Sequence, residues 1–549
     1  MRPRSIRRFA AMLAAALTVA TVPVAPAHAV SYVPLQGDGS SWAEPAIAQW
    51  ARDMVTQGIQ ISYTGDGSAQ GREHYIENQN DFAGSDIAFL KQGDPFNPGV
   101  ENVGWNFSYI PIVAGGTTFV YNLVVGGQKI RNLRLSGLTL ARIFTGSITN
   151  WSDPAITRDY GVQLPSQPIT VITRSDGSGA SYMFTRWLSK QYSSLWNGFC
   201  QAHGGPSPCG PTEFYPGFGG SIQKDGSDQV ATFLASPISE GSIGYDEYAY
   251  ALNYSLPAVK MLNSAGYYTL PTPSNVAIAL QAAIIDENPS DVDFLMQNLD
   301  NVYAYSDPRT YPLSSYSYLI IPRDVGGGGN NQPPPNWNTQ KGVTLGTWLN
   351  YVLCGAQSSA GVLGYSPLPK NLVVGGFTQV DHMPGHVPTP DLNQLNGCDN
   401  PTYSNGVNHL IVDAPMPSPC DKVTAPLNCA VRNGEAVNTG SGSGTGGGSG
   451  GSGGNGTTGG PTSGAGPSSS AAGNGAGSGG GTIDPNTGQI LTSGFNNGGP
   501  QAVYAEPVAV AGSSDQQIIL AILTVLELLA AIAVPSSIGI WLQRRRKQG

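Results

Sequence analysis

The chain has 549 residues, with 27 Lys and Arg against 36 Asp and Glu, so its formal net charge is −9. Only 11% of the residues are charged, whereas about a quarter are charged in a typical soluble domain. This acidic balance excludes the clustered positive surface that a non-specific nucleic-acid-binding protein needs. The 73 glycines and 42 prolines indicate either loop-rich structure or a low-complexity segment.

The N-terminus has the pattern of a secretory signal peptide over residues 1–29. Basic residues precede an apolar run at 9–24, and a small-x-small cleavage site ends at Ala29. The alternative, a first transmembrane helix, is disfavoured because Pro23 and Pro26 follow the run at once. We therefore expect export, with cleavage after Ala29.

The segment after the signal predicts an α/β fold. Short apolar runs such as 59–63 and 169–173 alternate with helical patterns from 46 to about 280. Such alternation is typical of β-α units and mostly parallel sheets. Because a domain of about 350 residues exceeds what one hydrophobic core usually supports, two lobes are expected.

The tripeptide Asp-Gly-Ser occurs four times, at 38–40, 66–68, 176–178 and 225–227, and a helical pattern follows each copy. One interpretation is helix capping, because Ser, Asp and Gly are favoured at N-caps and in the preceding turn. The other is an anion site, because such turns direct backbone N–H groups and the positive end of a helix dipole at one point.

The block 173–181 carries most of the anion-site argument. Arg174 is expected at a strand end, where its planar guanidinium can bind two oxygens of a phosphate-like group. Ser178 adds a hydroxyl, and the N–H groups of Ser178, Gly179 and Ala180 would point out of the next helix. The competing interpretation is a serine hydrolase, but a nucleophile elbow needs Gly-x-Ser-x-Gly and here the glycines adjoin Ser178 directly.

Six cysteines agree with an oxidising compartment. They are Cys200, Cys209, Cys354, Cys398, Cys420 and Cys429. Short separations favour the first pair and the last pair, which leaves the middle two together, although six cysteines allow fifteen pairings.

Metal binding is the competing interpretation of the cysteines and histidines. No Cys-x-x-Cys spacing exists. His382 and His386 stand four apart, but Pro384 and Gly385 between them disfavour the helix that would let them share a metal. We predict no metal and no cofactor.

The C-terminal part predicts a tether and a membrane anchor. Segment 439–512 is a Gly/Ser-rich linker, in which 21 of the 42 residues from 440 to 481 are glycine, and such a composition behaves as a flexible coil. Segment 518–542 is apolar and long enough for one transmembrane helix. The basic residues of 543–549 place that tail in the cytoplasm and the rest outside. Glu527 inside the span is either tolerated there or contacts another membrane protein.

Several blocks resemble the phosphate-binding protein of the bacterial high-affinity phosphate ABC transporter, and they occur in that family's order. The blocks are 37–45, 65–68, 81–86, 174–185 and 241–250. The Arg-x-Asp-Gly-Ser-Gly block and the Gly-x-Ile-Gly-Tyr-x-Glu-Tyr-Ala block are the most specific of them.

The resemblance implies a type II periplasmic-binding-protein fold of two lobes, the Venus-flytrap arrangement, over 30–374. Lobe 1 would comprise about 30–118 and 260–374, and lobe 2 about 119–259. Segment 375–438 is a cysteine-containing extension that the resemblance does not cover.

The resemblance also implies a phosphate site. Donors to the phosphate oxygens would be Ser41, Trp42 (backbone N–H), Ser68, Arg174, Ser178, Gly179 and Ala180. Asp176 would hold Arg174 in place, and Asp86 would accept the proton of monohydrogen phosphate. The chain departs from the family in having Ala180 where a hydroxyl is usual, Trp42 for phenylalanine, and extra acid at Asp38 and Asp66, which would repel an anion unless each bonds its own turn or pairs with a base such as Arg72.

Asp86 also has a physical logic of its own. A carboxylate at an anion site is unfavourable unless the ligand brings a donor, and monohydrogen phosphate brings one whereas sulfate does not. The alternative is that Asp86 caps a turn.

The expected function is an exported, membrane-anchored receptor that binds inorganic phosphate for an ABC permease, as a monomer and not as an enzyme. The alternatives are a binder of another tetrahedral oxyanion and a surface protein that uses the fold for adhesion or structure.

Overall fold

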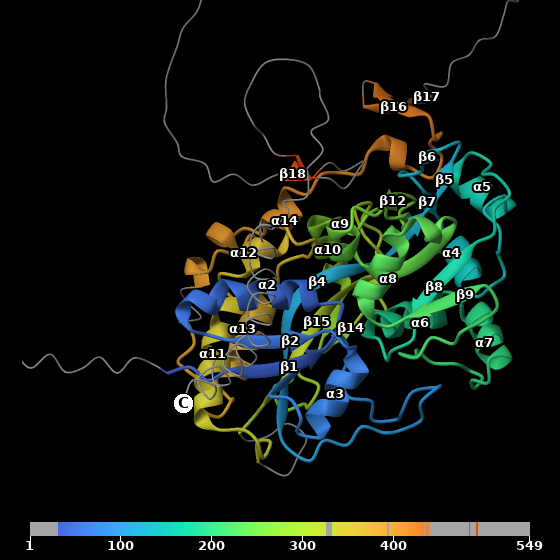
Figure 1. The fold of residues 1–549 in the computed structure, drawn as a ribbon. Coiled ribbons are helices and arrows are strands. Elements are labelled where there is room, and N and C mark those ends of the chain that lie inside the picture. Colours follow the sequence, from blue (N-terminus) through green and yellow to red (C-terminus); the bar gives the residue numbers. More distant parts are fainter. Residues whose placement is uncertain are drawn as a thin grey trace, which may run out of the picture. The chain divides into compact units, whose positions relative to one another are not determined.

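The computed structural model describes residues 31–324, 332–391, 395–432, 434–438, 482–483 and 490–491. Its central feature is a sheet of eight strands in the order β2-β1-β3-β15-β4-β10-β8-β9 (Figure 1). These strands are β1 (Leu35–Gly39), β2 (Ile61–Thr64), β3 (Phe82–Ser85), β4 (Phe107–Asn122), β8 (Thr170–Arg174), β9 (Ser221–Lys224), β10 (Ser242–Glu247) and β15 (Ser314–Pro322). The α/β prediction is confirmed.

The sheet is mixed rather than mostly parallel. Pairs β1–β2, β1–β3, β8–β9 and β8–β10 are parallel, whereas both neighbours of β4 are antiparallel to it, and so is β15 to β3. The long return strands β4 and β15 were not separable from parallel strands by their apolar pattern, because both kinds are buried on two faces.

Strand β4 joins two halves of this sheet. Its first part pairs with β15 as far as Gly116, opposite Ser314, and its last part pairs with β10 from Thr117, opposite Glu247. All 16 of its residues are buried. We call β1, β2, β3 and β15 with their helices the first half, and β8, β9 and β10 with their helices the second half.

Helices cover both halves. In the first half, α2 (Glu44–Met54) contacts β2, α3 (Ser68–Ile76) contacts β1 and β3, α11 (Thr339–Val352) contacts β1, and α13 (Lys370–Val380) contacts β4. In the second half, α6 (Gly179–Gln191) and α8 (Gly226–Ala235) contact β10 and β4, and α7 (Ser193–Ala202) packs on α6. The helices pack through an apolar face. In α2, for example, Ala46, Ile47, Trp50 and Met54 recur at helical spacing and form the buried face.

The remaining elements are short. Among the described residues, the other α-helices are α4 (Gly137–Phe144), α5 (Pro154–Tyr160), α9 (Tyr248–Asn253), α10 (Pro273–Ala279), α12 (Gln357–Ala360) and α14 (His409–Val412). The other strands are β5 (Val124–Val125), β6 (Gln128–Lys129), β7 (Arg134–Leu135), β11 (Lys260–Leu262), β12 (Tyr268–Thr269), β13 (Ile284–Ile285), β14 (Gln297–Asn298), β16 (Cys429–Arg432), β17 (Glu435–Asn438), β18 (Thr482–Ile483) and β19 (Ile490–Leu491).

Three disulfides connect the pairs that the sequence spacing favours. They join Cys200 to Cys209, Cys354 to Cys398, and Cys420 to Cys429. The middle bridge ties α11 and its C-terminal turn to the segment after residue 375.

The segment after residue 375 packs on the body. The boundary expected at 374/375 falls inside α13, which buries Phe377. Farther along, the Asp421 carboxylate lies 2.7 Å from the Lys260 ammonium, and the Ala425 carbonyl accepts from Arg134 at 2.7 Å. Buried polar contacts with β7 and β11 therefore attach this segment to the three-stranded sheet β12-β11-β7.

The predicted signal peptide and transmembrane segment 518–542 lie outside the described residues, as do the tail 543–549 and nearly all of linker 439–512. Within the part of the chain that the structure describes, no helix has both the length and the apolar character needed to cross a bilayer.

Candidate functional site

The four Asp-Gly-Ser turns converge. Three of their serines lie at or beside the start of a helix: Ser68 begins α3, Ser178 is the N-cap of α6, and Ser227 follows the first residue of α8. The fourth, Ser40, follows β1 in the approach to α2. All four serines are at most 2% exposed. Of the three serines at helix starts, Ser178 caps its helix with its side chain, whereas α3 and α8 have no side-chain cap.

Arg174 lies at the centre of the second-half side of this site. It ends β8, is 1% exposed, and its Nε donates to Oδ1 of Asp176 at 2.7 Å while Nη2 donates to Oδ2. Nη2 also donates to the Ser41 hydroxyl at 2.8 Å, and Nη1 donates to the Ser227 hydroxyl at 3.0 Å. Burial acts to lower the pKa of Arg174, but the charge of Asp176 raises it above its ordinary value.

Asp86 forms the first-half side. It follows β3, is 3% exposed, and accepts hydrogen bonds from Ser40 at 2.8 Å, Ser317 at 2.6 Å and Ser68 at 3.2 Å. Burial raises the pKa of its carboxyl, and the three hydroxyls and Arg174 oppose that shift. The net effect raises the pKa of Asp86, and the three hydroxyl donors are the contacts that favour its accepting carboxylate form.

The start of α6 faces Asp86 across the two halves. A Cβ added to Gly179 would lie 2.2 Å from Asp86 Oδ2 and 2.7 Å from the Ser68 hydroxyl. The Ser178 hydroxyl accepts from the Ser181 N–H at 3.3 Å. Gly179 and Ala180 are the first two residues of α6, where backbone N–H groups have no partner within the helix. The Ser178 N–H is different: it donates to the Glu213 carbonyl at 3.1 Å, so our expectation that it points out of the helix is wrong.

Two glycines make these turns possible. Gly39 has φ +124°, and a Cβ there would lie 2.1 Å from the Gly84 carbonyl oxygen. Gly67 has φ +104° and its N–H donates to the Gly39 carbonyl at 2.8 Å. Only glycine adopts such backbone angles without strain, so the first two Asp-Gly-Ser turns interlock.

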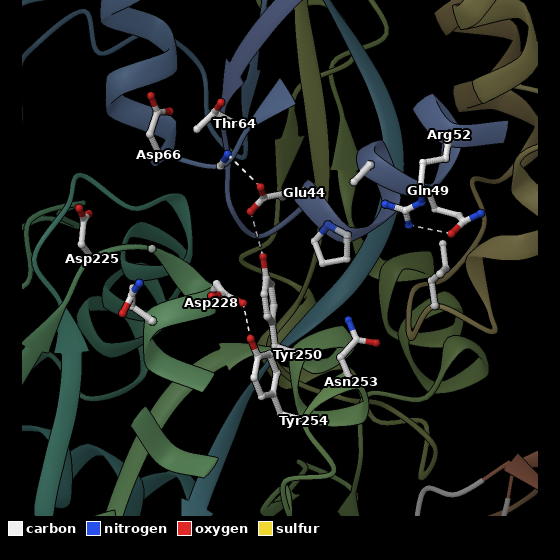
Figure 2. Close-up of a pocket in the computed structure, with 16 residues that line it drawn as sticks. Glu44, Gln49, Arg52, Thr64, Asp66, Asp225, Asp228, Tyr250, Asn253 and Tyr254 are labelled. Carbon is white, nitrogen blue, oxygen red and sulfur yellow. Dashed lines mark hydrogen bonds between the residues drawn. The ribbon is translucent and has the colours of Figure 1, made fainter. Parts of the chain in front are cut away.

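A hollow of about 890 Å³ is lined by residues of both halves (Figure 2), and Arg174, Asp176, Ser41 and Ser227 are not among the lining residues. α2 and the turn before α3 line one side, and α8 and α9 line the other. Its carboxylates are Glu44, Asp66, Asp225 and Asp228. Tyr250 lines it and donates to the Ser41 carbonyl at 2.8 Å. Because the side chains that line this hollow are acidic, attraction for an anion has to come from other groups, the buried arginine and the hydrogen-bond donors around it.

Comparisons with known proteins identify the family of this chain. A family profile described as the PBP superfamily domain matches residues 22–354. The phosphate-binding protein PstS of Xylella fastidiosa is 30% identical over 343 residues, which cover 62% of this chain and 83% of that protein. The chain belongs to the PstS phosphate-binding protein family of the PBP superfamily.

Two further proteins are similar. The phosphate-binding protein PstS 3 of Mycobacterium tuberculosis is 28% identical over 342 residues, covering 61% of this chain and 82% of that protein. A crystal structure of the phosphate-binding protein from Stenotrophomonas maltophilia is 18% identical, covers 68% of this chain and 99% of that one, and has a TM-score of 0.44.

The structure shows the contacts at two positions where the chain departs from the family pattern, Trp42 and Ala180. The Trp42 ring is buried, its Nε1 donates to the Thr117 hydroxyl at 3.3 Å, and its carbonyl accepts from Tyr365 at 2.6 Å. Next to Ala180, the Ser181 hydroxyl is 2.6 Å from the Tyr245 hydroxyl. Ser181 is thus bonded within the second half.

Asp38 and Asp66 pair with His74, not with Arg72. His74 Nδ1 lies 2.8 Å from Asp38 Oδ2 and 3.9 Å from Asp66 Oδ2. Burial acts to lower the pKa of His74, but the hydrogen bond and charge of Asp38 raise it. Burial, together with the charge of Asp38, raises the pKa of Asp66 to about 6. The histidine thus offsets part of the extra acid.

Arg72 instead connects the two halves. It is fully buried in α3, and its Nη2 lies 2.6 Å from Oε2 of Glu213, which precedes β9 in the second half. Its Nε lies 3.0 Å from Oε2 of Glu101, in the first-half segment before β4. Glu213 also accepts the Ser178 N–H, so this ion pair adjoins the α6 turn.

Four residues of the site were missed in the sequence. Ser40, Ser227, Ser317 and Asp246 all lie within it. Ser40 and Ser227 end Asp-Gly-Ser tripeptides, so a signal was present. Ser317 sits inside β15 with no local motif, and Asp246 occupies the variable position of the Gly-Tyr-x-Glu block.

Proposed function

We propose that this protein captures inorganic phosphate between the two halves of the sheet and delivers it to the permease of an ABC transporter. The observation that carries the proposal is the convergence of four helix-associated turns on one buried arginine and one buried carboxylate. The names of its relatives describe phosphate-binding proteins. Binding and release, rather than catalysis, is therefore the proposed activity.

The donors that would surround the anion are mostly neutral. The Ser41 and Ser178 hydroxyls, with the backbone N–H groups of Trp42, Gly179 and Ala180, would supply hydrogen bonds. The Ser68 hydroxyl donates its one proton to Asp86 in this structure, so it would have to turn to the anion to join them. Arg174 would supply the one positive charge, held in orientation by Asp176. Helix N-termini add partial positive charge without any ionisable group, which explains how an acidic protein can hold an anion.

Asp86 would set the specificity. With its three serine donors it faces the ligand as an acceptor, so it favours an oxyanion that still carries a proton. A fully deprotonated sulfate would put two acceptors together, which costs about 1–3 kcal/mol or more when buried. Arsenate has the same shape and protonation chemistry, so it is the closest competing ligand.

Calorimetric titration of the purified protein with phosphate, arsenate and sulfate tests the proposal. We expect micromolar or tighter phosphate binding, no heat with sulfate, and loss of binding in Arg174→Ala. Arg52→Ala is the matched control, because Arg52 lines the hollow and bonds Gln49 without touching the Arg174 cluster. No heat with any oxyanion would leave the adhesive or structural alternative.

Asp86→Asn tests the specificity separately. Its amide can donate to an unprotonated oxygen, so sulfate should gain affinity relative to phosphate. An unchanged ratio would assign Asp86 to the turn alone.

We further propose that segment 518–542 anchors the receptor in the cell membrane with residues 543–549 in the cytoplasm. The support is the apolar length of that segment and the basic residues after it. Fractionation of cells expressing the full chain or a chain ending at residue 517 tests it. Equal distribution of the two between membrane and soluble fractions would contradict it.

A further inference from the structure

A second buried carboxyl lies in the site, at Asp246. It is the penultimate residue of β10, is 1% exposed, and stands opposite Thr118 of β4. β10 runs parallel to β8 with Gly244 opposite Ile172, so Asp246 and Arg174 end neighbouring strands at the same level. The hydroxyl of Ser227, which accepts from Arg174, interacts with the Asp246 carboxyl.

The two oxygens of Asp246 are in different situations. Oδ1 accepts the Glu247 N–H at 2.9 Å. Oδ2 is buried and has no hydrogen-bond partner among the described residues. A buried oxygen in this state is costly as an anion and is better accommodated as the hydroxyl of a neutral acid.

Burial raises the pKa of both carboxyls, but Asp246 has fewer hydroxyl donors than Asp86, with the Ser227 hydroxyl opposing the shift at Asp246. Three serine hydroxyls donate to Asp86. The guanidinium nearest Asp246 already makes a two-pronged bond to Asp176, so its charge is largely neutralised.

The groups facing Asp246 are few. Arg174 comes from β8, Asp228 from α8 and Glu247 from β10, with tyrosine hydroxyls from α9, the turn after it and the segment after α12: Tyr250, Tyr254 and Tyr365. Only one of these groups is positive. Burial raises the pKa of Asp246 to about 8, against the opposing charge of Arg174.

We propose that Asp246 is a specificity-determining residue that enters the site as a neutral acid and donates its Oδ2–H to an oxygen of the bound anion. The inference rests on the proposed phosphate site and deepens it. The pocket then combines one accepting carboxylate, Asp86, with one donating carboxylic acid, Asp246. The ligand that satisfies both is a tetrahedral oxyanion with one hydroxyl and at least one bare oxygen.

The proposal sets the direction of a pH effect. Asp246 is neutral below a pH of about 8 and ionises above it, where its charge repels the anion and its donor is lost. Asp246→Asn keeps a donor of the same size at every pH. Because phosphate itself also titrates, the informative quantity is the ratio of dissociation constants, wild type over variant, measured at each pH.

The test is calorimetric titration of the full chain with inorganic phosphate between pH 7 and about pH 9.5, for wild type, Asp246→Asn and Asp246→Val. With a pKa of about 8, the ratio for the Asn variant should rise on the order of tenfold or more over this range. The Val variant, which has no donor, should bind about tenfold more weakly than wild type at pH 7. Asp225→Asn is the control, since its carboxylate lines the same hollow and is not among the groups that shift the pKa of Asp246, and its ratio should stay flat.

Each outcome either supports or contradicts the proposed role of Asp246. A flat ratio for a folded Asn variant overturns the inference alone, and so does a Val variant that binds phosphate as tightly as wild type. If wild type binds neither phosphate nor arsenate, the proposed function fails and this inference fails with it.

Discussion

Replacing Gly179 with alanine should weaken phosphate binding without harming the fold. Gly179 begins α6, and no left-handed backbone angle requires a glycine there. In isolation, alanine is favoured over glycine in a helix by up to about 1 kcal/mol. The obstacle is the other half of the protein, because the new Cβ would lie 2.2 Å from Asp86 Oδ2.

The magnitude follows from that distance. An ordinary contact to a Cβ is 3.4–4 Å, so a neighbour must move by more than 1 Å, and Asp86 is held by three serines. Overpacking of this kind typically costs about 1–3 kcal/mol. If this overpacking destabilises the arrangement in which Gly179 contacts Asp86, and that arrangement is the one that binds phosphate, the dissociation constant for phosphate rises by about fivefold to a hundredfold.

The assay is calorimetry with phosphate, accompanied by thermal melting with and without ligand. The melting temperature of the free variant should stay near that of wild type or rise, while the shift produced by phosphate shrinks. Gly198→Ala is the matched control, because Gly198 lies in α7 with nothing within 4 Å of its added Cβ. Wild-type affinity in Gly179→Ala would refute the reasoning.

Three other perturbations have defined outcomes. Arg174→Lys removes the planar fork shared with Asp176, so calorimetry should show phosphate affinity reduced by about tenfold or more; unchanged affinity would contradict the bidentate role. Replacing Cys354 and Cys398 with serine removes a disulfide that spans 44 residues and should lower the free energy of unfolding in urea by about 2–5 kcal/mol. Equal urea midpoints for wild type and variant would contradict this expectation. His74 has a folded-state pKa above its ordinary 6.5, so its protonated form stabilises the fold. The difference in melting temperature between wild type and His74→Gln should be full below pH 6.5 and vanish as pH rises through the folded pKa. A difference independent of pH would show that the ion pair with Asp38 contributes nothing.

The sequence predicted the parts of the site that depend on local pattern. Asp176 stands two residues from Arg174, so a turn between strand and helix brings the two together. Cysteines nine residues apart are close wherever the chain turns. The serines of the Asp-Gly-Ser turns follow the same logic.

Contacts that depend on long-range register could not be read in this way. Ser317 reaches Asp86 only because β15 pairs antiparallel with β3, which sets Tyr318 opposite Ser85. No spacing along the chain encodes that pairing.

The base that pairs with Asp38 is His74, whereas from the sequence we named Arg72 as one example of such a base. Residues 72 and 74 are two positions apart on α3, and at 3.6 residues per turn they point to nearly opposite sides. Since His74 faces Asp38, Arg72 must face away, toward Glu101 and Glu213.

The ion pairs of Arg72 bear on how fast a ligand can leave. Separating the halves must break the contact with Glu213, and an arginine left buried without a partner would make that step slow. Glu101 belongs to the same half as Arg72 and stays with it. If the halves of the proposed receptor separate, the guanidinium would therefore keep one carboxylate, which would lower the kinetic barrier to separation, while Glu213 would favour the arrangement seen in this structure.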